Sequence, residues 1–247
     1  MRAAVEPPVE PRVKHALARA SVYRLLGRAF GYPTPAVLAE LTELAARSAD
    51  AAPVAAEPLH RLANALRCVD AAAAADEYVF LFDRQVRCPP YESAYGPVPQ
   101  MAGKSAQLAD VAGFYTAFGL VAAAGQPDLE DHVAAELEFM SALALKEAYA
   151  EAEGEAEGLA VVRSAQVAFF TDHLGRWGEA FARSVREATP LPYYTAAADL
   201  LEAWIARERE ALGVRPVPLG DAAALGPLED DTFTCPMAGP EGSDESQ

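Results

Sequence analysis

Alanine dominates the apolar residues of this chain, and the residues that favour strands are sparse and scattered. Alanine and leucine have high helix propensity, and no stretch strings together the valine, isoleucine and threonine residues that strands prefer. Hydrophobic residues make up 52% of the sequence and charged residues 23%, a balance that allows a sizeable core. The sequence therefore predicts an all-α fold.

Apolar residues recur at helical spacing along most of the chain. Proline and glycine residues divide this pattern into segments, as at Gly31, Pro33 and Pro35. The expected helices cover residues 13–30, 35–47, 59–69, 71–82, 105–118, a helix starting near 128 or 131, a long helix or helix pair at 159–188, and 193–212. We expect one helical domain at 13–212, preceded by a flexible segment at 1–12.

The C-terminal part of the chain has a different composition. From Gly226 onward it carries six acidic residues, no basic residue and three prolines. Such a segment cannot bury enough apolar surface to offset the entropy of ordering. We expect residues 213–247 to be irregular and to end in a disordered acidic tail.

Charge and cysteine content exclude several classes of protein. Lys and Arg total 20 against 36 Asp and Glu, a net charge of −16, which repels nucleic acid and attracts cationic peptides. Cys68, Cys88 and Cys235 form no CxxC pair, which argues against a disulfide framework and a structural zinc site. No window resembles a signal peptide or a membrane span. These features predict a cytoplasmic protein with reduced thiols.

Residues 83–105 form a long connection with four prolines and two glycines. Long irregular segments inside compact domains are often functional. Within it, Tyr91 and Tyr95 bracket Glu92, and such a group can stack on a guanidinium while the carboxylate pairs with its charge. The alternative is that the tyrosines only pin the loop to the helices.

The stretch DHVAAELEFM, residues 131–140, places polar residues on an otherwise apolar helix. His132, Glu136 and Phe139 follow helical spacing and share one stripe. Metal ligands, acid/base groups and polar contacts shaping a binding groove all remain open. We expect Asp128 or Asp131 to cap this helix.

Known catalytic patterns are missing from the chain. The Glu-x-x-His repeat of helical di-iron proteins is absent, as are GxSxG and GxxxxGK[ST] motifs. A His/Glu hydrogen bond that orients the helix is commoner than a metal site. A metal-binding protein or metalloenzyme using His132 and Glu136 is the alternative function, and no cofactor is predicted.

Four segments, in order, resemble a known family. They are DEYVFLF at 76–82, PPYESAY at 89–95, FYTAFGL at 114–120 and PDLEDHVAAELEFM at 127–140. Together they resemble the TorD/DmsD family of redox-enzyme maturation chaperones, which is related to the NarJ type, over about residues 13–212.

The resemblance implies a single all-helical domain without enzymatic activity. Members bind the apo catalytic subunit of a molybdopterin oxidoreductase in the cytoplasm, together with its twin-arginine leader. They assist cofactor insertion and delay export until assembly is complete. A cationic leader suits the acidic composition of this chain.

Carried over by position, the resemblance implies a client-binding set composed of Tyr91, Glu92, Tyr95, Asp131, His132 and Glu136. We expect Asp131 and Glu92 to contact the guanidinium groups and His132 to hold the loop. The candidates for lining an apolar groove are Tyr78, Phe82 and Phe139. Pro127 lies further from the Asp-His pair than is usual in the family, which predicts a longer turn. The protein is expected to be a monomer or a dimer.

Overall fold

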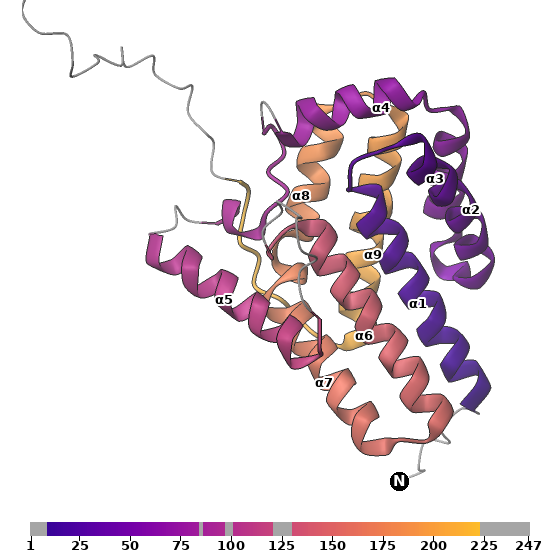
Figure 1. The fold of residues 1–247 in the computed structure, drawn as a ribbon, viewed down its shortest axis with the longest axis vertical. Helices are drawn as coiled ribbons and strands as arrows, with labels where there is room; N and C mark the ends of the chain where they lie inside the picture. Colours follow the sequence, from indigo (N-terminus) through magenta and orange to yellow (C-terminus); the bar gives the residue numbers. More distant parts are fainter. Residues whose placement is uncertain (1–8, 84–85, 97–100, 121–129, 223–247) are drawn as a thin grey trace, which may run out of the picture.

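The computed structural model describes residues 9–83, 86–96, 101–120 and 130–222. Within these ranges all regular secondary structure is helical (Figure 1), which confirms the all-α prediction. No helix of the described part is both long and apolar enough to cross a bilayer.

Two long antiparallel helices, α1 (Val9–Ala29) and α6 (Val133–Glu153), pack closely along their length. Arg12 near the start of α1 pairs with Glu151 near the end of α6 at 3.1 Å. At the other end, a Cβ on Gly27 would lie 3.1 Å from the carbonyl oxygen of Ala134. The two backbones therefore approach so closely here that a larger residue would have to push them apart slightly.

The remaining helices surround this pair and differ from the predicted ranges mainly at their ends. Thr34 caps α2 by accepting from the amide of Val37 at 3.2 Å, with Pro35 in the first turn, an arrangement typical of helix starts. The bounds are α2 (Pro35–Ala51), α3 (Ala56–Cys68), α4 (Ala71–Tyr78), α5 (Met101–Ala117), α7 (Ala156–Asp172), α8 (Leu174–Ala188) and α9 (Pro192–Leu212). Short turns of other helix types occupy Pro53–Ala55, Val79–Asp83 and Glu92–Ala94. The segment 159–188 forms a pair of helices, which was one of the two expected arrangements.

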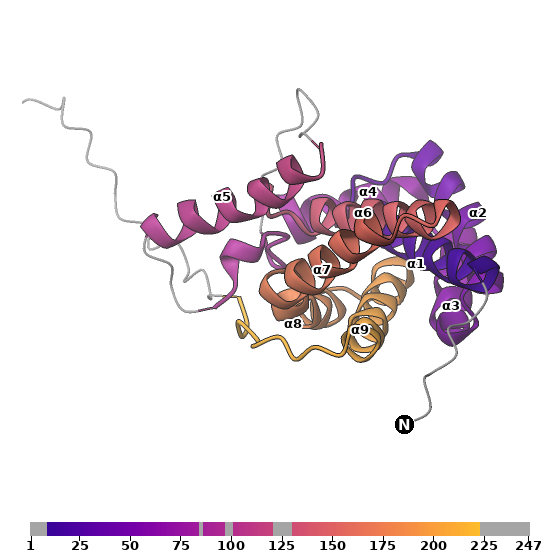
Figure 2. The ribbon, with the colours of Figure 1, turned by 90° about the horizontal axis from the view of Figure 1, so that it is seen from below.

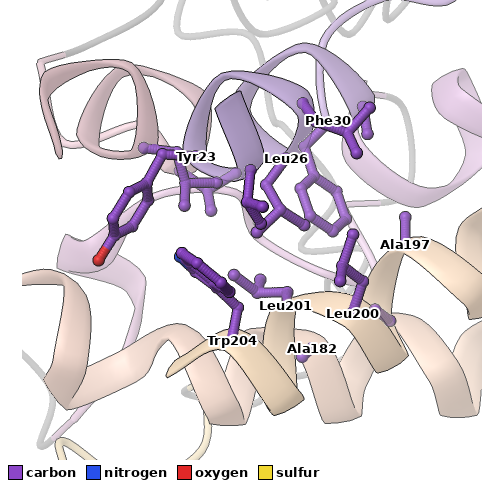
Figure 3. Close-up of a cluster of buried hydrophobic side chains, with 14 of the residues drawn as sticks. Tyr23, Leu26, Phe30, Ala182, Ala197, Leu200, Leu201 and Trp204 are labelled. Carbon is purple, nitrogen blue, oxygen red and sulfur yellow. The ribbon is translucent and has the colours of Figure 1, made fainter. Parts of the chain in front are cut away.

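The core lies where α1 faces α8 and α9. Tyr23, Leu26 and Phe30 point toward Leu200, Leu201 and Trp204, with Ala182 alongside (Figure 3). The rings of Tyr23 and Trp204 meet edge to face at 5.5 Å between centroids. Large buried aromatic groups dominate the energetics of such a core. By contrast, α5 lies at the edge of the bundle in both views (Figures 1 and 2).

The two ends of the described chain compare differently with the expected boundaries. Residues 9–12 belong to α1, although a flexible segment was expected there. Residues 213–222 are irregular as predicted, yet Ala222 bridges to Tyr95 and the Leu219 amide donates to Arg176 O at 3.0 Å. Gly175 permits this packing, because a Cβ there would lie 2.8 Å from Pro216. The tail from Gly226, with Cys235, lies outside the described residues.

Candidate functional site

The proline-rich loop and the start of α6 are joined by backbone pairing. The amide of Glu92 donates to Asp131 O at 2.9 Å, and the amide of Val133 donates to Pro90 O at 2.8 Å. Tyr91 and His132 form an isolated antiparallel bridge between these hydrogen bonds, and their rings lie 5.2 Å apart. Two of the four resembling segments therefore meet in space, which sequence spacing alone did not show.

The two residues of the Asp-His pair have different roles at the helix start. His132 is the N-cap, and its Nδ1 accepts from the amide of Ala134 at 3.1 Å. The side chain of Asp131 instead accepts from the amide of Ser93 at 2.9 Å. The expectation that Asp131 caps α6 was wrong, because its carboxylate is used to hold the loop. Asp128 and Pro127 lie outside the described residues.

Three carboxyl groups come together beneath the loop, and we refer to Glu92, Asp131 and Glu136 as the carboxyl cluster. All three are fully buried. The indole N–H of Trp177 donates to Glu136 Oε2 at 3.1 Å. One oxygen of each carboxyl group has no hydrogen-bond partner among the described protein atoms. Buried carboxyl groups with spare acceptors favour a proton or a cation.

The electrostatics of the carboxyl cluster follow from this burial. Loss of solvent, and then the nearby charge of Glu92, hold the pKa of Glu136 well above its ordinary value, against the hydrogen bond from Trp177. Burial, followed by the charge of Glu136, likewise raises the pKa of Tyr115 on α5. The Tyr115 hydroxyl donates to Glu130 O at 2.8 Å. Loss of solvent and the neighbouring acidic groups therefore act in the same direction on both side chains.

His173 joins the site from the break between α7 and α8. Its Nδ1 lies 3.0 Å from Glu92 Oε2, and its Nε2 lies 3.3 Å from Asp110 Oδ2 without the geometry of a hydrogen bond. The side chain is only 3% exposed. Sequence analysis missed His173, because Glu92 lies 81 positions earlier in the chain and no local spacing links them.

The predicted groove residues fall into two separate aromatic groups. Phe139 packs under α5, with ring centroids 4.9 Å from Tyr115 and 4.6 Å from Phe169. Tyr78 and Phe82 pack against each other at 5.2 Å, near α8 and α9. The structure therefore places the three candidates in two separate aromatic clusters and not along a single groove.

Tyr95 follows the short helical turn Glu92–Ala94 and is also buried. It is 4% exposed, its hydroxyl donates to Pro89 O at 3.1 Å, and its ring lies 5.1 Å from that of Trp177. In this conformation Tyr95 thus packs as the alternative interpretation describes, with the tyrosine pinning the loop to the helices. In the described part of the chain, no group of three or more His, Cys, Asp and Glu residues is arranged to hold a metal ion.

The described residues form an all-helical domain whose fold has a counterpart among solved structures. A crystal structure described as a redox enzyme maturation protein from Archaeoglobus fulgidus superposes with a TM-score of 0.50 at 22% identity. The match covers 76% of this chain and 93% of that one. At this level of identity the similarity concerns the fold.

The family follows from the sequence match. Residues 47–183, more than half of the chain, match the model of the nitrate reductase delta subunit family, so the chain belongs to that family. This match confirms the resemblance to the TorD/DmsD and NarJ-type proteins.

Two curated relatives support the same placement. A perchlorate reductase assembly chaperone protein from Dechloromonas aromatica (strain RCB) is 32% identical over 106 residues, which is 43% of this chain and 46% of the relative. The chaperone protein TorD from Vibrio cholerae serotype O1 (strain M66-2) is 30% identical over 123 residues, 50% and 54% of the two lengths. The matches thus span about half of each relative.

Proposed function

We propose that this protein is a cytoplasmic chaperone for a molybdopterin oxidoreductase. It binds the apo catalytic subunit and its twin-arginine leader, assists cofactor insertion, delays export until assembly is complete, and catalyses no reaction itself. The observation that carries the proposal is the carboxyl cluster beside the loop, in a family whose relatives are named as assembly chaperones.

The chemistry of the cluster suits an arginine-rich segment. A guanidinium group presents several N–H donors in a plane and pairs with carboxylates in a bidentate manner. Glu92, Asp131 and Glu136 each have a spare acceptor oxygen. The net charge of −16 adds long-range attraction for a cationic peptide.

Access to the cluster requires movement, because Glu92 and Asp131 are fully buried. Direct pairing with a guanidinium therefore needs the loop or α5 to be displaced. His132 and Tyr91 fix the loop to α6 by their bridge, and Tyr95 anchors its other end. In this proposal Phe139 lines the apolar floor that α5 now covers, whereas Tyr78 and Phe82 belong to a second apolar surface.

Isothermal titration with a synthetic Arg-Arg leader peptide, and a Lys-Lys peptide as control, tests this proposal. We expect the Arg-Arg peptide to bind more tightly. Asp131→Asn should weaken binding roughly tenfold or more, since a charged hydrogen bond is lost. The asparagine carbonyl can still accept from the Ser93 amide, so the helical circular-dichroism signal should not change.

Asp50→Asn is the matched control for this experiment, because Asp50 is exposed on α2, on the opposite side of the bundle from α5 (Figure 1). It should bind like the wild-type protein. Equal binding of the Arg-Arg and Lys-Lys peptides would refute leader recognition, and normal binding by Asp131→Asn would remove Asp131 from the site.

A further inference from the structure

His173 contacts the loop, α5 and α7 at the site. One ring nitrogen lies 3.0 Å from the Glu92 carboxylate in the loop, and the other lies 3.3 Å from the Asp110 carboxylate on α5. Its ring centroid also lies 5.6 Å from that of Phe114 on α5 and 5.0 Å from that of Phe169 on α7. The residue thus lies between the elements that enclose the carboxyl cluster.

The protonation state of an imidazole decides how many carboxylates it can bind as a donor. A neutral imidazole has one N–H and one acceptor nitrogen, so it can donate to only one carboxylate. An imidazolium has two N–H groups and a positive charge, so it can attract Glu92 and Asp110 at the same time. Protonation of His173 therefore strengthens the connection between the loop and α5.

α5 covers the site mainly through one face. Phe114 and Tyr115 of α5 pack on Phe139 and Phe169, and the Tyr115 hydroxyl donates to Glu130 O next to the carboxyl cluster. The Asp110 side chain is 66% exposed. The helix itself lies at the edge of the bundle (Figure 2). Displacement of α5 would uncover Phe139 and bring solvent to the carboxyl cluster.

We propose that His173 is a positioning residue that fastens α5 to the loop through Glu92 and Asp110 when protonated, and releases α5 when neutral. The closed state is then favoured at lower pH, and rising pH opens the carboxyl cluster. The link to client binding rests on the proposed function, whereas the fastening of α5 is a property of the free protein.

Other titratable and charged groups lie near His173, and their contribution to any pH dependence has to be distinguished from that of His173. Glu92 of the loop and Asp110 of α5 face its two ring nitrogens. Asp172 and Arg176 lie close to it in the chain at the α7–α8 break, and Asp131, Glu136, Glu130 and Tyr115 interact with one another and with Glu92 in the carboxyl cluster and on α5. Apart from Asp110 itself, all of them are unchanged in an Asp110→Asn variant. A difference between that variant and the wild-type protein therefore reports the contact of Asp110 with His173.

Hydrogen–deuterium exchange of the α5 amides, in the full chain without any ligand, tests the proposal. Protection factors corrected for intrinsic exchange are compared at about pH 6 and about pH 8, a range in which histidine side chains change charge in proteins. We expect wild-type α5 to be better protected at the lower pH. Asp110→Asn should lower that protection roughly two- to fivefold and remove most of its dependence on pH. His173→Gln should also remove the dependence of α5 protection on pH.

Asp50→Asn serves as the control and should reproduce the wild-type protection at both pH values. The proposal is overturned if Asp110→Asn leaves α5 protection at the lower pH unchanged, or if the wild-type protection does not depend on pH. Because Asp110 is largely exposed, loss of folding is not expected to complicate the result.

A second arm measures Arg-Arg peptide binding over the same pH range. Wild-type affinity should rise with pH, and Asp110→Asn should bind roughly two- to fivefold more tightly than wild type at the lower pH. Binding without this difference would refute a role of the contact in client access. A pH-dependent α5 that binds no peptide would support the fastening by His173 and refute leader recognition, so the two failures are distinguishable.

Discussion

Glu136 lies fully buried in the first turn of α6, where only one of its carboxyl oxygens accepts a hydrogen bond. Burial and the charges of Glu92 and Asp131 raise its pKa well above the ordinary value. When folding raises the pKa of an acid, the shift adds to the free energy of unfolding, and this contribution is complete below the pKa of the unfolded state. This contribution is lost as the pH rises through the folded pKa.

Glu136→Gln should therefore flatten the dependence of stability on pH. Glutamine keeps an acceptor for the Trp177 indole but cannot ionise. We expect the variant to be more stable than wild type at about pH 8 and similar at about pH 5, as measured by urea midpoints at each pH. Glu43→Gln, exposed on α2, should behave as wild type. A variant less stable than wild type at the higher pH would show that the ionised carboxylate is needed.

At the scale of elements, a buried ionic network joins four helices. Arg19 on α1 donates to Glu208 on α9 at 2.6 Å, and also to Glu147 on α6 and Gln166 on α7. Burial opposes its charge, but the hydrogen bonds and charge of Glu208 raise the pKa of Arg19 further. A buried charge of this kind tolerates the loss of its partner poorly.

Arg19→Met should lower the free energy of unfolding by about 3–5 kcal/mol, because the fully buried Glu208 would lose its closest cationic partner and Glu147 would keep only the pair with Arg163. Arg24→Met on the same helix removes an exposed pair, with Glu40 at 3.2 Å, in which the Arg24 side chain is 62% exposed. Its effect should stay below about 1 kcal/mol. Equal losses in the two variants, in urea denaturation, would contradict the account of this network.

The elements also show what the sequence could and could not predict. Helical periodicity and the Pro and Gly breaks located most helices, because these signals are local. The ends were less accurate, as α5 begins at Met101 rather than residue 105. The contacts of His173 and the packing of Pro216 on Gly175 depend on residues distant in the chain. Local patterns carry no information about them.

The site residues show the same division. The motif order singled out Tyr91, Asp131 and His132, and the structure brings the loop and the helix start together through the Tyr91–His132 bridge and the Asp131–Ser93 hydrogen bond. It did not indicate that Glu92 and Asp131 would be buried, since burial is a property of the assembled bundle. A binding role for these residues, which sequence resemblance suggests, therefore depends on a conformational change that the sequence did not reveal.

At the scale of the whole molecule, a helical bundle of this family combines a net charge of −16 with a closed, negative site. The charge favours encounter with a cationic segment at long range. Apolar burial under α5 would supply affinity once the site opens. Membership of the family and the buried carboxyl cluster together support the chaperone proposal. Which subunit is the client depends on the sequence of that subunit.

Affinity purification of the protein from a lysate of its native host, followed by mass spectrometry, tests the central claim most directly. Protein carrying Asp131→Asn provides the matched control. The account predicts one large molybdopterin-binding subunit with its leader uncleaved, recovered with wild-type protein and depleted with the variant. Recovery of no such subunit with the wild-type protein would contradict the proposed chaperone function.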